Sequence, residues 1–369
     1  MPARGCAPPF RAPAFTVEAL VGRYESVRAE LREAPHRWLV TGAAGFIGSN
    51  ITKNLLELGQ HVVGLDNFST GYQRNIDQAI AEGAAGGGTF RLIRGDIEDF
   101  AVCQEACHQV DFVIHQAAIG SVPRSMEDPI AVNRTNVDGF VHMLTAARDA
   151  GARRFVYASS CAMYGDAPGT PKRESDELRA LSPYAVTKHV NELYAAVYQR
   201  AFSISTVGLR YFNVFGPRQD PDGAYAAVIP SWMRNLLLDE PCRIYGDGQT
   251  TRDFVYVEDV VQANILASLV ADGDATGTAY NIGSAQPTSL TELFALIRDS
   301  LAERRPEISD REPTFEPFRS GDIRHSRADI AKAGSQLGFA PGYSVQSGLE
   351  AAVEWYAENL VPAKSAVPA

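Results

Sequence analysis

Residues 38–48 read Trp-Leu-Val-Thr-Gly-Ala-Ala-Gly-Phe-Ile-Gly, and this stretch decides the fold. The apolar run from Trp38 to Val40 predicts a buried strand, and three glycines open a helix directly after it. Gly42 allows a tight turn, Gly45 lets the backbone approach a phosphate, and Gly48 lets the helix pack closely on the strand. The free N–H groups at such a helix start bind phosphates, so the stretch predicts a dinucleotide site.

The alternation of strand and helix continues outward from this stretch. Short β-branched runs alternate with helical patterns from Arg37 to about Arg210. Such βα units predict an α/β fold, a doubly wound parallel sheet of the Rossmann type with helices on both faces. After Tyr211 the alternation breaks and Pro, Gly and Asp become frequent, which predicts a smaller, irregular C-terminal substrate domain.

The expected boundaries follow from these changes of pattern. They are an N-terminal extension at 1–35, a dinucleotide-binding domain at 36–210 to which 252–282 returns, and a substrate-binding domain at 211–251 and 283–360. Residues 1–14 are expected to be loose. Leu20, Tyr24, Val27 and Leu31 then share one face of a helix, which Thr16 would cap and which would cover part of the core more readily than dock a partner. The glycine-rich stretch 83–88 predicts a surface loop.

Composition excludes several classes of protein. Of 369 residues, 45% are apolar and 21% charged, which fits a folded globular protein. No apolar run is long enough to span a membrane, and a net charge of −10 argues against non-specific binding to nucleic acid or anionic membranes. The five cysteines are scattered; Cys103 and Cys107 are expected to pack in the core, and no metal site is predicted. Without an apolar secretory segment at the N-terminus, a cytoplasmic location is expected.

Polar residues at the strand ends specify the dinucleotide. Asp66 ends the second strand, where a carboxylate accepts hydrogen bonds from the adenosine ribose and repels a 2′-phosphate, so NAD is favoured over NADP. Asp96 follows the third strand and is expected either to face the adenine amino group or to cap a helix. Gln116, Ala117 and Ala118 follow the fourth strand, and their mostly small side chains suit a backbone that passes close to the cofactor.

A tyrosine and a lysine carry the chemistry. Tyr184 and Lys188 lie four apart on a predicted helix and therefore on one face of it. An ammonium near a phenol lowers the pKa of the phenol, and such a tyrosine takes a proton from a sugar hydroxyl while hydride leaves for NAD. Ser160, at the end of the fifth strand, would hydrogen-bond to the reacting oxygen.

With these residues in view, the chain resembles the extended short-chain dehydrogenase/reductase family over residues 36–355, and within it the nucleotide-sugar 4-epimerases. It is most similar to the bacterial UDP-N-acetylglucosamine 4-epimerases of polysaccharide biosynthesis. The stretches that carry the resemblance are VTGAAGFIGSN, LDNFSTGYQRN, HQAAIGSVPRS, SPYAVTK, LRYFNVFGPRQDP, DGQTTRDFVYVEDV and SGDIRHSRAD.

The resemblance implies a mechanism and a set of contacts. Tyr184 would deprotonate the sugar 4-OH, hydride would move to resident NAD, and the flat 4-keto sugar would rotate and take hydride back on its other face. Lys188 would also hold the nicotinamide ribose. A homodimer would form through two helices, at 128–150 and 183–202. The NAD contacts implied are Gly42, Gly45, Phe46, Ile47, Gly48, Asp66, Asn67, Phe68, Ser69, Thr70, Gly71, Asp96, Ile97, Gln116, Ala117, Ala118, Thr135, Tyr184, Lys188 and Tyr211.

The resemblance also implies the UDP-sugar contacts. Arg252 and Arg319 would contact the diphosphate, and Asn213 would contact the diphosphate or the sugar. Asp322 would hold the uridine ribose, and the backbone from Arg243 to Tyr245 would contact uracil. Gly120, Ala227 and Ser326 are small at the positions that flank the sugar, which leaves room for a 2-acetamido group. The remaining expected contacts are Ser121, Ser160, Cys161, Tyr184 and Val228.

One residue departs from the pattern, and several alternatives stay open. Cys161 stands where the subgroup often has a third serine; it is expected to be a small packing substitute and not a nucleophile. A 4,6-dehydratase would need acids just after Ser160, and none is present. An epimerase of UDP-glucose and UDP-galactose, a UDP-glucuronate epimerase or decarboxylase, and a regulatory NAD-binding protein are the alternatives, the last disfavoured because Tyr184 and Lys188 are both present.

Overall fold

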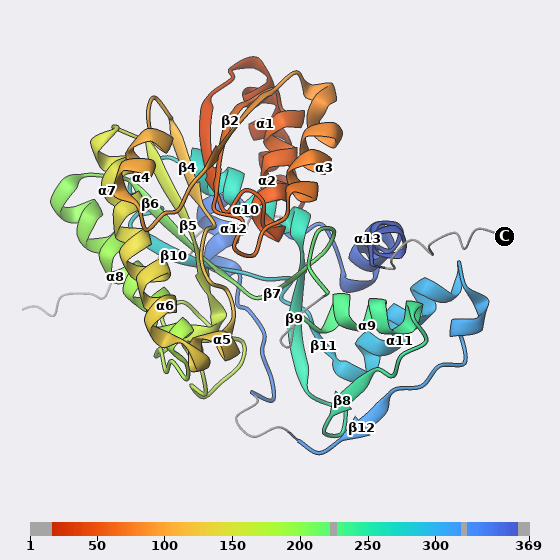
Figure 1. The fold of residues 1–369 in the computed structure, drawn as a ribbon. Helices are drawn as coiled ribbons and strands as arrows, with labels where there is room; N and C mark the ends of the chain where they lie inside the picture. Colours follow the sequence, from red (N-terminus) through yellow and green to blue (C-terminus); the bar gives the residue numbers. More distant parts are fainter. Residues whose placement is uncertain (1–16, 222–226, 319–322, 361–369) are drawn as a thin grey trace, which may run out of the picture.

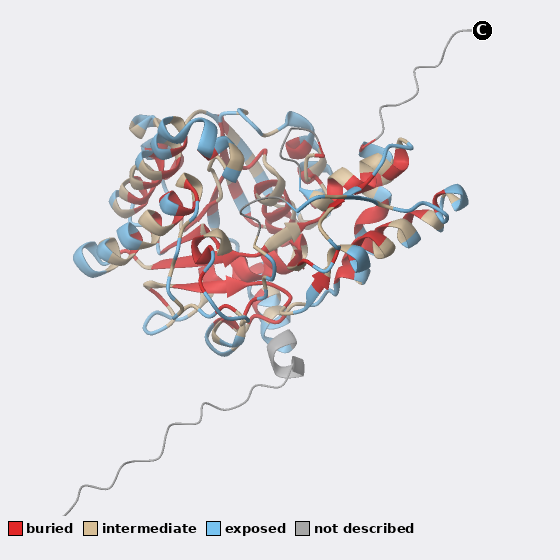
Figure 2. Ribbon diagram, turned by 90° about the horizontal axis from the view of Figure 1, so that it is seen from below, coloured by how far each residue is buried: buried red, intermediate tan, exposed pale blue. Residues whose placement is uncertain are grey.

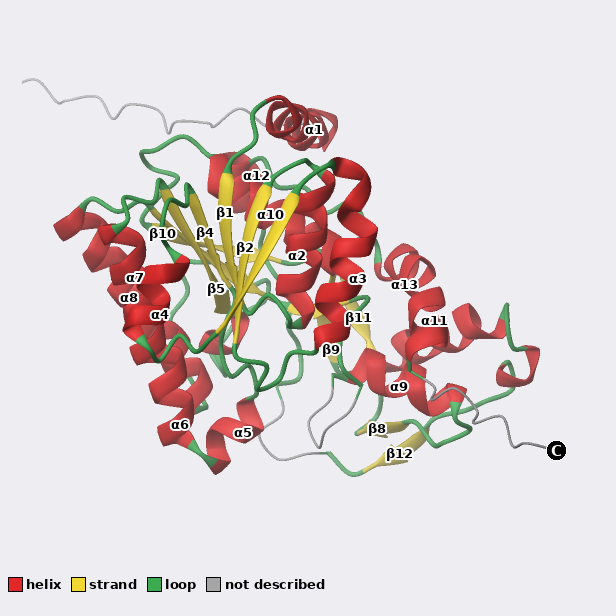
Figure 3. Cartoon of the chain, turned by 45° about the horizontal axis from the view of Figure 1, so that its top comes forward, coloured by secondary structure: helices red, strands yellow, loops and turns green. Residues whose placement is uncertain are grey.

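The computed structural model describes residues 17–221, 227–318 and 323–360. At its centre lies a parallel sheet of seven strands in the order β10-β6-β5-β4-β1-β2-β3 (Figures 1 and 3). Strand order reverses between β1 and β4, as the doubly wound fold requires, which confirms the predicted fold class. The strands are β1 (Arg37–Thr41), β2 (His61–Asp66), β3 (Thr89–Arg94), β4 (Phe112–His115), β5 (Arg154–Ser160), β6 (Thr206–Tyr211) and β10 (Thr278–Ile282).

Helices cover both faces of this sheet, and Figure 3 shows the two layers on either side of the strands. One layer contains α1 (Val17–Glu33), α2 (Phe46–Glu57), α3 (Gln73–Gly83), α10 (Val257–Leu269) and α12 (Ala331–Leu337). The other contains α4 (Phe100–Ala106), α7 (Gly139–Asp149) and α8 (Pro183–Phe202), with α5 (Val122–Glu127) and α6 (Pro129–Asn133) beyond its end.

Strand β1 shows how the sequence builds this double core. Trp38 and Val40 pack in the cluster beneath α2 and α10, while Leu39 points to the opposite face and packs with residues of α4 and α7. Successive side chains of a strand point to opposite faces, so a strand that is apolar at every position is buried on both. Figure 2 shows this as an almost continuously buried sheet between half-exposed helices.

The smaller lobe has its own core and two small sheets. Its strands are β7 (Asn213–Phe215), β8 (Arg243–Tyr245), β9 (Thr251–Tyr256), β11 (Pro287–Ser289) and β12 (Thr314–Glu316). Its helices are α9 (Val228–Leu237), α11 (Leu290–Ala302) and α13 (Val345–Asn359), with a short helix, η4 (Pro306–Ile308). Buried aromatic and aliphatic side chains, Trp232, Phe294 and Tyr356 among them, form the core between these helices.

Two expectations differ from the structure. Strand β9 does not return to the main sheet; it pairs with β7 and β11, and only α10 and β10 come back. Asp253 holds β9 in the small sheet, because its buried carboxylate accepts hydrogen bonds from Ser284, Ala285 and Ala328.

The glycine-rich stretch 83–88 is also not a simple surface loop. Gly83 is a buried residue of α3, and residues 84–86 form a short helix, η1 (Ala84–Gly86). Gly86 lies so close to α2 that an added Cβ would be 2.2 Å from the Leu56 carbonyl oxygen. These glycines therefore serve close packing between backbones and not only chain reversal.

The N-terminal helix covers part of the core, as its pattern predicts. Val27 and Leu31 of α1 are buried in the cluster shared with α10, and Tyr24 packs against that cluster. Gln60 ties the helix to the sheet, because its amide donates to the Leu31 carbonyl at 2.6 Å. Thr16 and the side chain of Leu20 lie outside the described part. Among the described residues, no helix has both the length and the apolarity to cross a bilayer.

Candidate active site

A cavity of about 620 Å³ opens at the carboxyl ends of the central strands, where ligands bind in this fold class. Eighteen of the twenty residues expected to contact NAD line it, and the exceptions are Phe68 and Gly71. Those that line it are Gly42, Gly45, Phe46, Ile47, Gly48, Asp66, Asn67, Ser69, Thr70, Asp96, Ile97, Gln116, Ala117, Ala118, Thr135, Tyr184, Lys188 and Tyr211.

The glycine turn has the shape that a pyrophosphate needs. Gly42 has φ +66°, and a Cβ at Gly48 would be 2.1 Å from the Gly42 carbonyl oxygen, so the turn and helix α2 touch through their backbones. Gly45 is the N-cap of α2 and has no side chain to accept from the N–H groups of the first turn, which leaves these donors to a ligand anion. This cradle fits the pyrophosphate of a dinucleotide.

Asp66 is positioned by the backbone around it. Its Oδ2 accepts a hydrogen bond from the Ala44 N–H at 2.9 Å and its Oδ1 from the Phe68 N–H at 2.7 Å. Burial raises the pKa of this carboxyl and the two N–H donors lower it. Each oxygen keeps a second lone pair, so the carboxylate can also accept from ribose hydroxyls.

The loop at 67–71 folds against the glycine turn. Gly71 lies on Ala44, since a Cβ there would be 2.7 Å from the Ala44 Cβ. Phe68 has φ +59° and lies under the Arg94 guanidinium, 4.1 Å from its ring centroid. These two residues therefore shape the loop and do not line the cavity. Asn67 donates to the Asp96 carboxylate at 2.7 Å, which joins the loop to the end of β3.

The catalytic residues expected from the sequence meet at the end of β5. Ser182 caps α8, so the helix begins in time to place Tyr184 and Lys188 one turn apart on its buried face. The Tyr184 hydroxyl is hydrogen-bonded to Ser160, which closes the first turn after β5. The Lys188 ammonium donates to the Ala158 carbonyl at 2.9 Å and lies 5.9 Å from the Tyr184 ring centroid.

Burial is the main influence on the titration of both groups. Burial raises the pKa of Tyr184 to about 12, and the hydrogen bond from Ser160 opposes this rise. Burial also lowers the pKa of Lys188 to about 8. That Lys188 lowers the pKa of the phenol stays a prediction; in this structure its ammonium donates to the Ala158 carbonyl.

A buried ion pair behind the catalytic residues was not expected. Glu192 lies one turn beyond Lys188 on α8 and binds Arg210 of β6 through both of its oxygens, at 2.9 and 2.7 Å. It also accepts from the Ser159 hydroxyl at 2.6 Å. Since Ser159 donates away from the cavity, Ser160 is the serine of the pair whose hydroxyl meets Tyr184. The spacing of Tyr184, Lys188 and Glu192, four residues each, was the available signal.

Two further hydrogen-bonded groups at the NAD cavity were not expected from the sequence. Glu98 accepts from Thr135 and Arg134, both at 2.6 Å. Tyr211 shares a hydrogen-bond network with Gln116 and with Asn264 of α10. Asn264 comes from a helix far along the chain, so nothing in its local sequence marks it.

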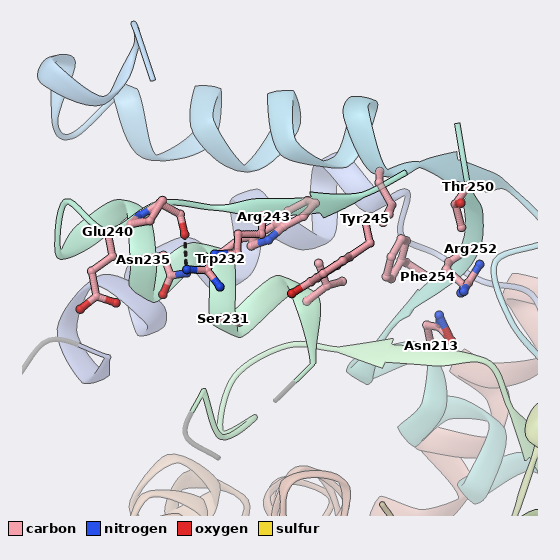
Figure 4. A pocket seen from close by; sticks show the side chains of 13 residues that line it. Asn213, Ser231, Trp232, Asn235, Glu240, Arg243, Tyr245, Thr250, Arg252 and Phe254 are labelled. Carbon is pink, nitrogen blue, oxygen red and sulfur yellow. Dashed lines mark hydrogen bonds between the residues drawn. The ribbon is translucent and has the colours of Figure 1, made fainter. Parts of the chain in front are cut away.

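A second cavity, of about 520 Å³, lies in the smaller lobe (Figure 4). It adjoins the first at β7, where Asn213 lines one cavity and Val214 the other. Five expected substrate contacts line it, namely Asn213, Val228, Arg243, Tyr245 and Arg252. Ser231, Trp232, Asn235, Glu240, Pro241, Thr250, Phe254 and Leu290 complete it and were not expected.

The remaining expected contacts fall in different places. Gly120 and Ser160 line the first cavity. Ser121 instead caps α5, accepting from the Arg124 N–H at 3.2 Å. Ala227 is the exposed N-cap of α9 and lines neither cavity. Ser326 is half-buried beside Arg252, its N–H bonded to the Thr251 carbonyl.

Three of the expected substrate contacts remain: Arg319, Asp322 and Cys161. Arg319 and Asp322 lie outside the described residues. Cys161 packs against the cluster of Tyr164, Phe212 and Ala328, and burial raises the pKa of its thiol to about 12. It therefore stays a thiol at neutral pH, as a packing residue would.

Comparison with known proteins places this site in a family. The model of the NAD dependent epimerase/dehydratase family matches residues 38–283, which include the glycine turn, Asp66, Tyr184 and Lys188. The UDP-glucose 4-epimerase of Mycolicibacterium smegmatis is 37% identical over 322 residues, which span 87% of this chain and 98% of that protein.

Two solved structures resemble the whole fold. The UDP-N-acetylglucosamine 4-epimerase of Methanobrevibacter ruminantium, in complex with UDP-N-acetylmuramic acid, has a TM-score of 0.80 and 34% identity, covering 88% of this chain and 99% of that one. The UDP-glucose 4-epimerase of Thermus thermophilus in complex with NAD has a TM-score of 0.74 and 34% identity, covering 87% of this chain and 98% of that one.

Proposed function

Because this chain belongs to the NAD-dependent epimerase/dehydratase family, we propose that it interconverts UDP-N-acetylglucosamine and UDP-N-acetylgalactosamine. The chain is an enzyme, a nucleotide-sugar 4-epimerase with bound NAD. We propose in addition that its sugar is N-acetylated, that individual residues have the roles given below, and that the enzyme is a dimer.

In the proposed reaction Tyr184 is the general base and acid. As the phenolate, its oxygen takes the proton of the sugar 4-OH and later returns that proton, while Ser160 holds the same oxygen by a hydrogen bond. NAD, when bound, supplies the acceptor for the C4 hydride and gives the hydride back. With a pKa of about 12, Tyr184 is protonated at neutral pH, and a positive charge near its oxygen would lower this pKa. Lys188, on the same face of α8, can supply that charge.

The open space at Gly120 supports the proposal of an N-acetylated sugar. Gly120 lines the first cavity near the catalytic residues, and a Cβ added there would meet no atom within 4 Å. An acetamido group needs such a gap, and a longer side chain at this position would fill it. A roomy wall admits the larger sugar without strongly rejecting the smaller one, so the preference over UDP-glucose is expected to be modest.

UDP-glucuronate is a second candidate because of Arg124. This residue lines the first cavity close to Gly120 and offers a guanidinium that could bind a C6 carboxylate. The other arginine of that wall, Arg134, is paired with Glu98.

The deciding measurement is kcat/KM for UDP-N-acetylglucosamine, UDP-glucose and UDP-glucuronate side by side. Gly120→Tyr should lower the first by roughly 5–150-fold more than the second, because the new side chain fills the gap that the acetamido group needs and overlap in a packed wall costs about 1–3 kcal/mol. Gly22→Tyr, on the exposed side of α1, is the matched control, because a Cβ added there also meets no atom within 4 Å. A higher kcat/KM for UDP-glucose or UDP-glucuronate in the parent enzyme would overturn the N-acetyl assignment.

We also propose that two copies pair through α6, α7 and α8. Ile130, Val186, Leu193 and Val197 are apolar yet 76%, 50%, 57% and 47% exposed, and α8 carries three of them in one stripe. Apolar stripes of this kind suit a four-helix bundle between copies. Leu193→Arg should halve the mass measured by light scattering; a monomeric parent protein would refute the dimer.

A further inference from the structure

The segment from Gly216 to Asp220 connects β7 with the rest of the smaller lobe, and side chains distant in sequence fix almost every residue of it. The Tyr356 hydroxyl of α13 accepts from the Gly216 N–H at 3.1 Å and donates to the Gly216 carbonyl at 2.9 Å. The Asn50 amide of α2 donates to the Pro217 carbonyl at 3.0 Å. In Figure 1 this connector is the green segment that runs from β7 towards the lower end of α2.

Arg218 is the central residue of the connector. It is only 4% exposed and has φ +70°, a conformation that residues other than glycine adopt at some cost unless their surroundings hold them there. One guanidinium nitrogen binds both oxygens of Glu82 on α3, at 3.0 and 3.1 Å. The other donates to the Asn50 side-chain oxygen at 2.6 Å, so Asn50 holds the connector through both atoms of its amide.

Asp220 extends these contacts to the NAD loop. Its carboxylate accepts from the Tyr72 hydroxyl at 2.6 Å. Tyr72 directly follows the loop at 67–71 and caps α3, and its N–H is bonded to the Ala44 carbonyl of the glycine turn. The connector therefore reaches three elements around the adenosine half of the cavity: α2, α3 and the end of the loop.

None of the five side chains that make these contacts, Asn50, Tyr72, Glu82, Arg218 and Asp220, lines either cavity. They cannot act by touching NAD or the sugar in this arrangement. Their contacts instead join a segment of the smaller lobe to the walls of the NAD cavity. Two of these contacts are charge-assisted, the stronger kind of hydrogen bond: Arg218 to Glu82, which is part-buried, and Tyr72 to Asp220, which is exposed.

We propose that residues 216–220, with Asn50, Tyr72 and Glu82, form a clasp that keeps NAD resident. The clasp ties the loop at 67–71 and the start of α2 to one segment of the other lobe, so the walls of the cavity separate only if these bonds break. A resident cofactor is what the proposed epimerisation needs, because hydride leaves and returns within one turnover and the same NAD serves the next. This proposal depends on the proposed epimerisation only in that NAD stays bound between turnovers, and it does not depend on which sugar is the substrate.

The test measures NAD exchange in the holoenzyme. Purified protein is incubated with an excess of isotopically labelled NAD, and the labelled fraction of bound NAD is followed over time by mass spectrometry after denaturation. Tyr72→Phe removes the hydroxyl and keeps the ring, which lies under Arg74. Arg218→Lys keeps the charge and loses the fork that spans Glu82 and Asn50.

Both variants should exchange NAD about 10- to 100-fold faster than the parent, which corresponds to about 1.4–2.7 kcal/mol. The matched controls are Tyr194→Phe, on α8 and 39% exposed, and Arg298→Lys, which pairs with Asp299 and Glu312. These should exchange at the parental rate. Initial turnover in saturating NAD should stay near the parental value in all four.

Unchanged exchange in folded Tyr72→Phe and Arg218→Lys, with folding checked by circular dichroism, would overturn the clasp. Equal acceleration in the controls would overturn it as well, since any substitution would then loosen the cofactor. Faster exchange in an enzyme that proves to prefer UDP-glucose would leave the clasp standing and refute only the sugar proposed above.

Discussion

Replacing Gly48 by alanine should abolish NAD binding, and the structure supplies the magnitude. The added Cβ would be 2.1 Å from the Gly42 carbonyl oxygen, 2.8 Å from its carbon and 3.1 Å from the Ala43 Cα, whereas ordinary contact begins near 3.4 Å. The neighbours are backbone atoms, so no side-chain rotation relieves the overlap. The turn has to move by about 1 Å, and forced overpacking of this kind costs about 1–3 kcal/mol or more.

That displacement acts directly on the cofactor site. The Gly42 carbonyl also accepts from the Gly45 N–H at 3.0 Å, so moving it disturbs the cap of α2 and the N–H groups at the helix start. Misplacing preorganised groups by about 1 Å typically costs on the order of 100-fold in function. We expect Gly48→Ala to purify with little NAD and to melt a few degrees lower than the parent.

The assay is the molar ratio of NAD to protein in the supernatant after denaturation, together with thermal unfolding by circular dichroism. Gly120→Ala is the matched control, because it lines the same cavity and its new methyl group would meet no atom within 4 Å. Gly45→Ala, with its nearest contact at 3.2 Å, should fall between the two. A Gly48→Ala protein with full NAD content would refute the close-packing argument, as would a loss of NAD in the control.

Three other substitutions test the chemistry of the site. Tyr184→Phe should lower turnover by roughly 10²–10⁴-fold with NAD content unchanged, and near-normal turnover would mean that another group moves the proton. Lys188→Met should abolish turnover. It should also stabilise the NAD-free protein below pH 8, by an amount on the order of 3 kcal/mol. The reason is that burial lowers the pKa of the lysine from 10.5 to about 8, so that the folded protein holds the charge at a cost in free energy. The unfolded chain binds more protons between those values, so the stability of the parent should rise from pH 8 to 10.5 and that of the variant should not; equal pH profiles in urea titrations would contradict this. Asp66→Asn should reduce NAD retention, because an amide has one acceptor oxygen whereas the carboxylate has two, which serve the ribose and the N–H groups of Ala44 and Phe68. The measurement is equilibrium dialysis of the holoenzyme, and full retention would show that these oxygens do not bind the ribose.

The fold and the NAD half of the site could be predicted from the sequence because their causes are local. A buried strand, a glycine turn and a helix start are contiguous in residues 38–48, and each of the second to fourth strands carries its polar residue at its last position or within two positions after it. Parallel strands bring their carboxyl ends to one edge, so Asp66, Asp96 and Gln116 meet without further information. The four-residue spacing likewise places Tyr184 and Lys188 on one helix face.

Tertiary structure alone decided the features made by residues far apart in the chain. Strand β9 reads like a strand of the main sheet, but Asp253 and its partners at 284, 285 and 328 hold it in the small one. Side chains of α9 and the segment after it complete the second cavity, and the distance from the Lys188 ammonium to the Tyr184 ring depends on a carbonyl of β5. The Glu192–Arg210 pair and the contacts of Arg218 join elements separated by 18 to 168 residues. A sequence pattern shows which face of its own element a side chain occupies, but the partner that satisfies a buried charge is chosen by packing, which no local pattern records.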